Sequence, residues 1–210
     1  LYKQAGNRSD DEVKTLELVL KFDPRDLPTL RRLAEVAEAR GDLDQIEARY
    51  KAILGVDDKD AASYYGLARA AEKRQTLRQA IELYGQARDA GEVERAPADV
   101  TRLLQACWVP EKPIAGASLT AVYRNVATSL EKAWKTRLTD KPALKGSLKM
   151  RITNSPEGRA EKVELVDDDL KDPYLEAHLY FVLLQANWPK PGPKDPRKFS
   201  LKFDLPPTMQ

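Results

Sequence analysis

Trp188-Pro189-Lys190-Pro191 separates two stretches of the chain that differ in their apolar spacing. Before it, from residue 174 to 186, apolar residues recur at helical intervals. After it, Phe199, Leu201 and Phe203 alternate with polar residues, which is the pattern of a half-buried strand. Proline fixes its own φ and biases the preceding residue away from helical angles. The sequence therefore predicts a helix that ends here and a strand that closes the chain.

Working upstream, residues 119–138 have the spacing of an amphipathic helix, and residues 148–152 alternate apolar and polar side chains as a strand does. The loop 154–159 leads to a second strand that ends near Val166. Asp172-Pro173 has the residues of an N-cap and a first helical position. The predicted fold is a small α+β domain in the order α-β-β-α-β. The second helix must carry the chain back across the sheet, so we expect an antiparallel sheet in the order second, first, third strand.

The N-terminal half repeats with a period of 34 residues. The positions that show it are Leu33, Ala34, Ala37, Gly41 and Tyr50, followed by Leu67, Ala68, Ala71, Gln75 and Tyr84. Small residues let two paired helices approach closely, and the aromatic residue fills the groove between pairs. A fixed period of this length predicts an all-α solenoid of helix pairs.

Both ends of the solenoid depart from this period. Upstream, residues 16–24 fit the second helix of a preceding repeat, whose first helix we expect only as residues 1–6. Downstream, Val100, Leu103, Leu104 and Cys107 form one apolar stripe, which predicts a capping helix. Residues 109–118 hold two prolines and a glycine without periodicity. We therefore predict repeats with a cap over residues 1–108, a linker over 109–118 and the α+β domain over 119–210.

Composition narrows the possible partners. Lys and Arg number 35 against 33 Asp and Glu, without long blocks of either sign, so we expect no nucleic-acid partner. No apolar run reaches the roughly 20 residues of a membrane span. The chain begins at Leu1 rather than at methionine, and we interpret it as a fragment whose signal or anchor would lie upstream.

Candidate catalytic residues are few. His178 is the single histidine and lies among apolar helix positions, where we expect a satisfied core side chain. Cys107, the single cysteine, allows no internal disulfide and has the setting of a small buried hydrophobe. The run 167–169 has three adjacent carboxylates but lacks the alternating ligand spacing of a calcium loop. We therefore predict no enzyme, no cofactor and no metal site.

The repeats resemble tetratricopeptide repeats. Residues 119–204 resemble the C-terminal domain of TonB, and more closely its variant at the ends of AgmX/PglI-type proteins of myxobacteria. Pro142-Ala143-Leu144-Lys145-Gly146 matches that family's Pro-x-Leu-x-Gly, and Trp188-Pro189-Lys190-Pro191 matches its Phe-Pro-x-Pro. The family's Cys-Tyr-Glu is replaced by Ala133-Trp134-Lys135, and its second cysteine by His178, so a disulfide between those positions is impossible here.

The resemblance implies a non-enzymatic adaptor of the bacterial cell envelope. We expect a periplasmic component of a gliding-motility or TonB-like transport machine, with inner- or outer-membrane proteins as partners. The alternative is an assembly scaffold, periplasmic or cytoplasmic, whose C-terminal domain is only a dimerisation or docking unit. A lipobox, signal peptide or membrane helix upstream would favour the envelope.

Two protein-binding surfaces are implied. In tetratricopeptide repeats the first helix of each pair lines the concave groove, and matching positions here are Arg31, Glu35, Glu38, Tyr65, Arg69, Glu72 and Lys73. In TonB domains the last strand accepts an extended peptide as an added strand, which implies a partner beside Lys198, Ser200, Lys202 and Asp204. Two simpler interpretations remain open: a solvated charged helix face, and lysines that protect a sheet edge from aggregation.

Overall fold

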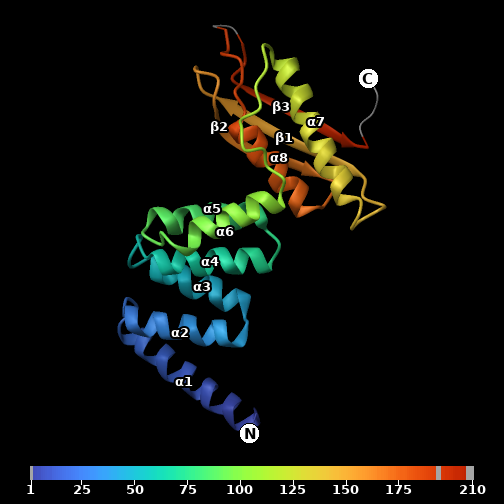
Figure 1. Ribbon diagram of the computed structural model, residues 1–210. Helices are drawn as coiled ribbons and strands as arrows, with labels where there is room; N and C mark the ends of the chain where they lie inside the picture. Colours follow the sequence, from blue (N-terminus) through green and yellow to red (C-terminus); the bar gives the residue numbers. More distant parts are fainter. Residues whose placement is uncertain (1, 193–194, 207–210) are drawn as a thin grey trace. The chain divides into compact units, whose positions relative to one another are not determined.

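The computed structural model describes residues 2–192 and 195–206, with side chains from residue 10 onward. The chain folds as two compact units that meet in sequence between Thr101 and Arg102 (Figure 1). The first consists of helices and the second of helices and strands, as the sequence predicts. The extent of the predicted linker, 109–118, stays a prediction.

The N-terminal unit is built from α1 (Tyr2–Phe22), α2 (Leu27–Arg40), α3 (Leu43–Leu54), α4 (Ala61–Lys73), α5 (Leu77–Asp89) and the start of α6 (Arg95–Ala106). The first residues of α2, α4 and α6 are 34 positions apart, as are those of α3 and α5. The predicted period is thus the period of the helix pairs. Helix α1 corrects one prediction, because it runs from Tyr2 to Phe22 without a break after residue 6. One glycine without a proline costs a helix only about 1 kcal/mol. Leu1 lies outside the described residues.

The turns between and inside the pairs follow the period as well. Asp26 and Asp60 both cap their helices by accepting a hydrogen bond from the backbone three residues on. Gly41, after α2, has a φ of 69°, and its counterpart Gln75 has a φ of 61°. The second turn therefore adopts the same left-handed conformation without a glycine, which is unfavourable for a residue with a Cβ.

Between neighbouring pairs the core is tightly packed. A Cβ on Gly66 would lie 2.1 Å from Cε2 of Tyr50, so the missing side chain at Gly66 makes room for that ring. Ile46 packs with Ala37 and Ala70. The aromatic residue therefore fills the groove between pairs, as the sequence predicts.

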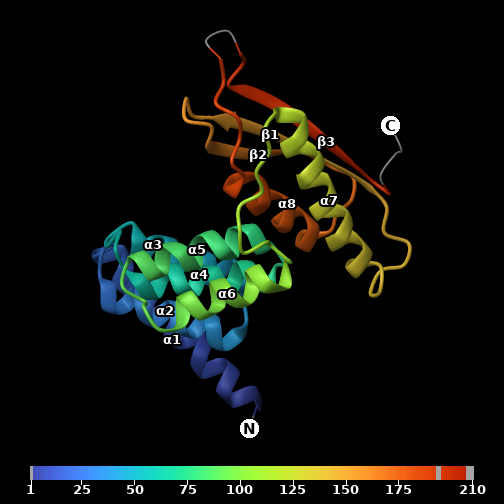
Figure 2. The same cartoon turned by 45° about the horizontal axis from the view of Figure 1, so that its top comes forward.

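The C-terminal unit contains α7 (Leu119–Arg137), β1 (Gly146–Asn154), β2 (Ala160–Asp168), α8 (Pro173–Gln185) and β3 (Lys198–Leu205). The antiparallel sheet has the predicted order β2-β1-β3. Helices α7 and α8 pack together against one face of the sheet (Figure 2). The core between the helices and the sheet includes Leu148, Met150 and Ile152 of β1. The unit is thus a two-layer fold with one face of its sheet uncovered by helices.

The tryptophan before the proline turn belongs to this core. Trp188 is 4% exposed, its Nε1 donates to the carbonyl of Leu183 at 3.2 Å, and its ring packs edge-on against Phe199 at 5.4 Å. It therefore joins the end of α8 to the start of β3. Trp188 thus anchors the connection between the end of α8 at Gln185 and the start of β3 at Lys198.

Candidate protein-binding surfaces

The predicted groove residues lie on α2 and α4, the first helices of two successive pairs. Glu38 of α2 forms an ion pair with Arg69 of α4 at 3.8 Å, and Arg31 pairs with Asp60 at the start of α4 at 3.3 Å. Lys73 joins Glu38 and Arg69 around a hollow of about 30 Å³, which is too small for a side chain. These residues form one mixed-charge surface whose charges are largely paired within the chain.

Tyr65 connects this surface to the next pair. Its hydroxyl donates to Asp99 at 2.8 Å, the guanidinium of Arg95 lies 4.4 Å from its ring centroid, and the ring meets that of Tyr84 edge-on at 5.3 Å. Glu72 accepts a hydrogen bond from the Tyr84 hydroxyl at 3.0 Å. Tyr65 and Glu72 therefore contribute to the packing of the repeats in addition to the predicted groove.

Glu35 lies apart from the other predicted groove residues. It pairs with Arg32 at 2.9 Å, and Arg32 also pairs with Glu12 of α1 at 2.6 Å. The structure thus connects Glu35 to the α1 side of α2. The other six residues extend along the α2 and α4 faces, toward α6.

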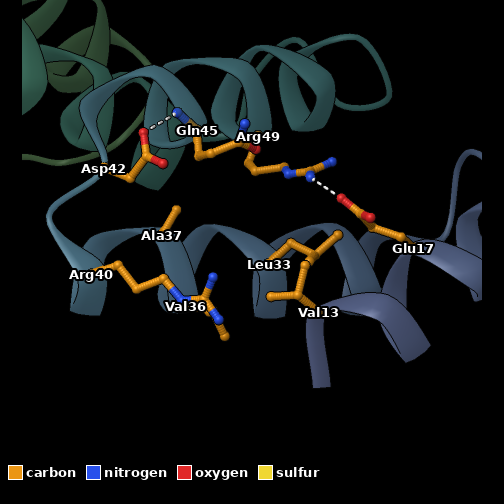
Figure 3. Close-up of a pocket in the computed structure, with 9 residues that line it drawn as sticks. All are labelled: Val13, Glu17, Leu33, Val36, Ala37, Arg40, Asp42, Gln45 and Arg49. Carbon is orange, nitrogen blue, oxygen red and sulfur yellow. Dashed lines mark hydrogen bonds and ion pairs between the residues drawn. The ribbon is translucent and has the colours of Figure 1, made fainter. Parts of the chain in front are cut away.

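A pocket that the sequence did not predict lies between α1, α2 and α3 (Figure 3). It has a volume of about 280 Å³. Its apolar wall is formed by Val13, Leu33, Val36 and Ala37, and its polar rim by Glu17, Arg40, Asp42, Gln45 and Arg49. Arg49 pairs with Glu17 at 2.7 Å across the rim, and Arg40 pairs with Asp10 at 2.7 Å. The charges of Glu17, Arg40 and Arg49 are therefore paired within the chain, and Asp42 accepts a hydrogen bond from the amide of Gln45.

The repeat period gives a physical reason for this pocket. At the next junction Ile46 fills the space between Ala37 and Ala70, whereas the residue 34 positions earlier is Glu12. Glu12 extends to Arg32 instead of filling the interior. One ion pair does follow the period, since Asp10 with Arg40 recurs as Asp44 with Arg74. In the sequence, this repeated ion pair is visible as an aspartate thirty positions before each of the two arginines.

The sheet offers a second surface at the free edge of β3. The amide of Asn154 donates to the carbonyl of Arg197 at 2.8 Å, and the amide of Asp169 donates to the carbonyl of Ser147 on the opposite side of β1. In an antiparallel ladder the hydrogen-bonded pairs alternate. With the register Arg151 to Ser200, the backbone groups of residues 198, 200, 202 and 204 therefore point away from β1. These are the four residues that the sequence predicted for the edge.

The side chains of β3 alternate as expected. Phe203 is buried and Phe199 and Leu201 are half-buried on the helix side, whereas Lys198, Ser200 and Lys202 are exposed. Asp204 is half-buried and pairs with Lys202 at 2.9 Å. One acceptor of the free edge is occupied, because the hydroxyl of Tyr123 on α7 donates to the carbonyl of Lys202 at 3.0 Å. The Tyr123 ring also stacks on Phe203 at 5.1 Å.

The buried titratable groups serve packing. His178 is 1% exposed, and its Nδ1 lies 2.7 Å from the carbonyl of Cys107, which can only accept a hydrogen bond. Nδ1 therefore carries the proton, and Nε2 faces the Ser129 hydroxyl at 3.3 Å. Burial lowers the pKa of His178 to about 4. The expectation of a satisfied core histidine is confirmed.

Cys107 and Asp172 are likewise enclosed. Burial, with a smaller contribution from Asp172, raises the pKa of the Cys107 thiol to about 12, so the thiol stays protonated. Burial of Asp172 opposes its ionisation, but hydrogen bonds from Lys141 and Arg137, both to Oδ2, outweigh it and lower its pKa. Within residues 2–192 and 195–206 no cluster of three metal-ligating side chains occurs, and no helix there is long and apolar enough to cross a membrane.

These features define a helical-repeat protein joined to a small α+β domain. Two crystal structures of MamA are similar in fold over 67% of this chain, each with a TM-score of 0.44. They are 18% and 19% identical to it, and the likeness covers 73% and 68% of their own chains. Neither a protein-family model nor a curated protein matches this chain.

Proposed function

We propose that this chain is a non-enzymatic adaptor that recruits a partner protein by strand addition to the free edge of β3. The observation that carries this proposal is the set of backbone groups at residues 198, 200, 202 and 204, which point away from β1. Such groups bind an extended peptide through main-chain hydrogen bonds, while alternate side chains give selectivity. The resemblance to TonB domains supports the same use of this strand.

The repeats provide a second partner surface in the same proposal. Arg69 and Lys73 are exposed on α4 beside Glu38, and the mixed charge suits a partner segment with both signs. With two surfaces on one chain, the protein links two partners. We further propose that the adaptor acts in the cell envelope, as a component of a gliding-motility or transport machine; the sequence resemblance of residues 119–204 to TonB domains supports this.

Strand addition is tested with Ser200→Pro, compared with Ser200→Ala as the matched control. The amide of Ser200 points to the free edge, so proline there removes a donor for the incoming strand and leaves the hydrogen bonds to β1 intact. Alanine removes only the hydroxyl. Binders are first selected on residues 1–210 from displayed random 12-residue peptides, and their affinities for the variants are then measured.

We expect Ser200→Pro to weaken the selected peptides by about two- to tenfold, since one main-chain hydrogen bond is lost, while Ser200→Ala binds normally. Thermal melts of both variants verify that the fold is kept. Undiminished affinity of a folded Ser200→Pro variant excludes strand addition at this edge.

The alternative, a dimerisation unit, gives a different result. In that case light scattering detects a dimer of the unmodified chain that Ser200→Pro converts to monomer.

A further inference from the structure

The uncovered face of the sheet is basic beside the β3 edge. Lys149 and Arg151 of β1 stand in register with Lys202 and Ser200 of β3, and Lys198 lies at the start of the same strand. Among the described residues Lys149, Arg151 and Lys198 form no ion pair within 4.0 Å, whereas Lys202 pairs with Asp204. Four cations therefore lie on two adjacent strands, with Asp204 as the acidic residue of β3.

Acidic side chains on this face are concentrated on the opposite strand. Glu164 and Asp167 of β2 stand opposite Arg151 and Lys149. A hydrogen bond from Lys162 is the largest cause that lowers the pKa of Glu164. The positive charges of Lys162, Lys198 and Arg151 lower it further. A strand added beside β3 would lie on the other side of the cations, where the part of the chain that the structure describes has no fourth strand to supply carboxylates. The cations of β1 therefore face carboxylates on β2, whereas among the described residues the free side of β3 has no strand whose carboxylates could pair with Lys198 and Lys202.

The helix side of the same edge is apolar. Phe199 and Leu201 remain half-exposed at the edge, while Phe203 is covered by the Tyr123 ring. Side chains of an added strand alternate between the two faces of the sheet. The residues that face α7 would therefore cover Phe199 and Leu201, and the residues between them would lie beside Lys198, Ser200 and Lys202.

We propose that the β3 edge selects an amphipathic acidic strand, with carboxylates four residues apart beside Lys198 and Lys202, a small polar residue between them beside Ser200, and apolar residues at the two intervening positions. This inference rests on the proposed strand addition and specifies the chemistry of the partner. A further carboxylate beside Asp204 would be repelled by its charge. The two selected carboxylates therefore lie beside Lys198 and Lys202.

The probes are two synthetic peptides that differ only in charge. One contains the core Glu-Val-Ser-Val-Glu and the other Lys-Val-Ser-Val-Lys, each flanked by two threonines and blocked at both ends. Each is titrated into the ¹⁵N-labelled chain of residues 1–210, and the backbone amide shifts of Ser200, Lys202 and Asp204 report binding. The variants are Lys198→Glu with Lys202→Glu, and Lys162→Glu on β2 as a control with the same type of substitution at the opposite edge.

We expect the acidic peptide to bind about tenfold more tightly than the basic one, because two cross-strand pairs change from attractive to repulsive. The double variant should reverse this preference, the Lys162→Glu control should keep it, and added salt should reduce it.

Equal binding of both peptides, with shifts at the β3 amides, overturns the acidic selection and leaves strand addition standing. Absence of shifts at these amides with either peptide overturns both proposals. A third outcome is that the signals shift only for residues on the uncovered face of the sheet and that Ser200→Pro binds the peptide as tightly as the unmodified chain does. The peptide carboxylates then bind the lysines without adding a strand, and this outcome also overturns the proposal.

Discussion

The hydroxyl of Tyr123 on α7 lies 3.0 Å from the carbonyl oxygen of Lys202, the acceptor at the middle of the free β3 edge. The same ring stacks on Phe203, so packing holds it in place. The bond satisfies a backbone acceptor that would otherwise face solvent, and it occupies a group that an added strand would use. If β3 binds a partner by the proposed strand addition, Tyr123 competes with it for the Lys202 carbonyl.

Tyr123→Phe should strengthen binding of a strand-forming peptide. It keeps the ring on Phe203 but frees the Lys202 carbonyl, and one hydrogen bond is worth about 0.5–1.5 kcal/mol, so we expect a gain of about two- to tenfold. Calorimetric titration with the acidic peptide measures it. The gain should vanish in the double variant with Ser200→Pro, and an unchanged or weaker affinity of Tyr123→Phe would show that this hydroxyl does not compete with the peptide.

Gln75→Gly should stabilise the repeats. Gln75 has a φ of 61°, whereas its counterpart Gly41 has a φ of 69° with no heavy atom near the Cβ position. Relief of the left-handed conformation favours the glycine variant by about 1 kcal/mol. The reciprocal change, Gly41→Gln, should cost a similar amount. Urea unfolding of both variants checks the pair, and a loss of stability in Gln75→Gly would contradict the argument.

Gly66→Ala should destabilise the same unit. The added methyl carbon would lie 2.1 Å from Cε2 and 2.4 Å from Cζ of Tyr50, so α4 and the ring must move apart. Overpacking of this kind typically costs about 1–3 kcal/mol. Gly85→Ala is the control, because its Cβ meets no heavy atom within 4 Å. Tyr50→Leu should recover part of the loss in the Gly66→Ala background, and additive losses in that double variant would exclude this contact as the cause.

Stability should fall as the pH drops from about 6.5 toward 4. Burial lowers the pKa of His178 to about 4 from its ordinary value of 6.5, so the unfolded chain binds this proton before the folded chain does. The loss amounts to about 3 kcal/mol when the pH reaches 4, with a further loss below it as Asp172 becomes protonated. Thermal melts between pH 8 and 4 measure it. His178→Asn should flatten the profile above pH 4, and an identical profile in that variant would assign the pH dependence to other groups.

Local spacing in the sequence determined the order of helices and strands, the 34-residue period and the sides of β3 that carry Phe199, Leu201 and Phe203. These properties follow from near neighbours, because helical and extended chains place side chains at fixed intervals. The cap at Asp172, the turn at Trp188 and the burial of His178 could be predicted for the same reason. The groove residues could be assigned to helices, but not their pairing within the chain.

Only the tertiary structure decided which backbone groups of β3 are free, because this depends on the register between β1 and β3 rather than on either strand alone. The Tyr123 bond joins residues 79 apart in sequence, and the His178 bond joins residues 71 apart. The pocket beside α1 likewise depends on where Glu12 turns, toward Arg32 or toward the interior. In each case the sequence allows several partners for the same group. The packing of elements that are distant in the chain determines which partner is used.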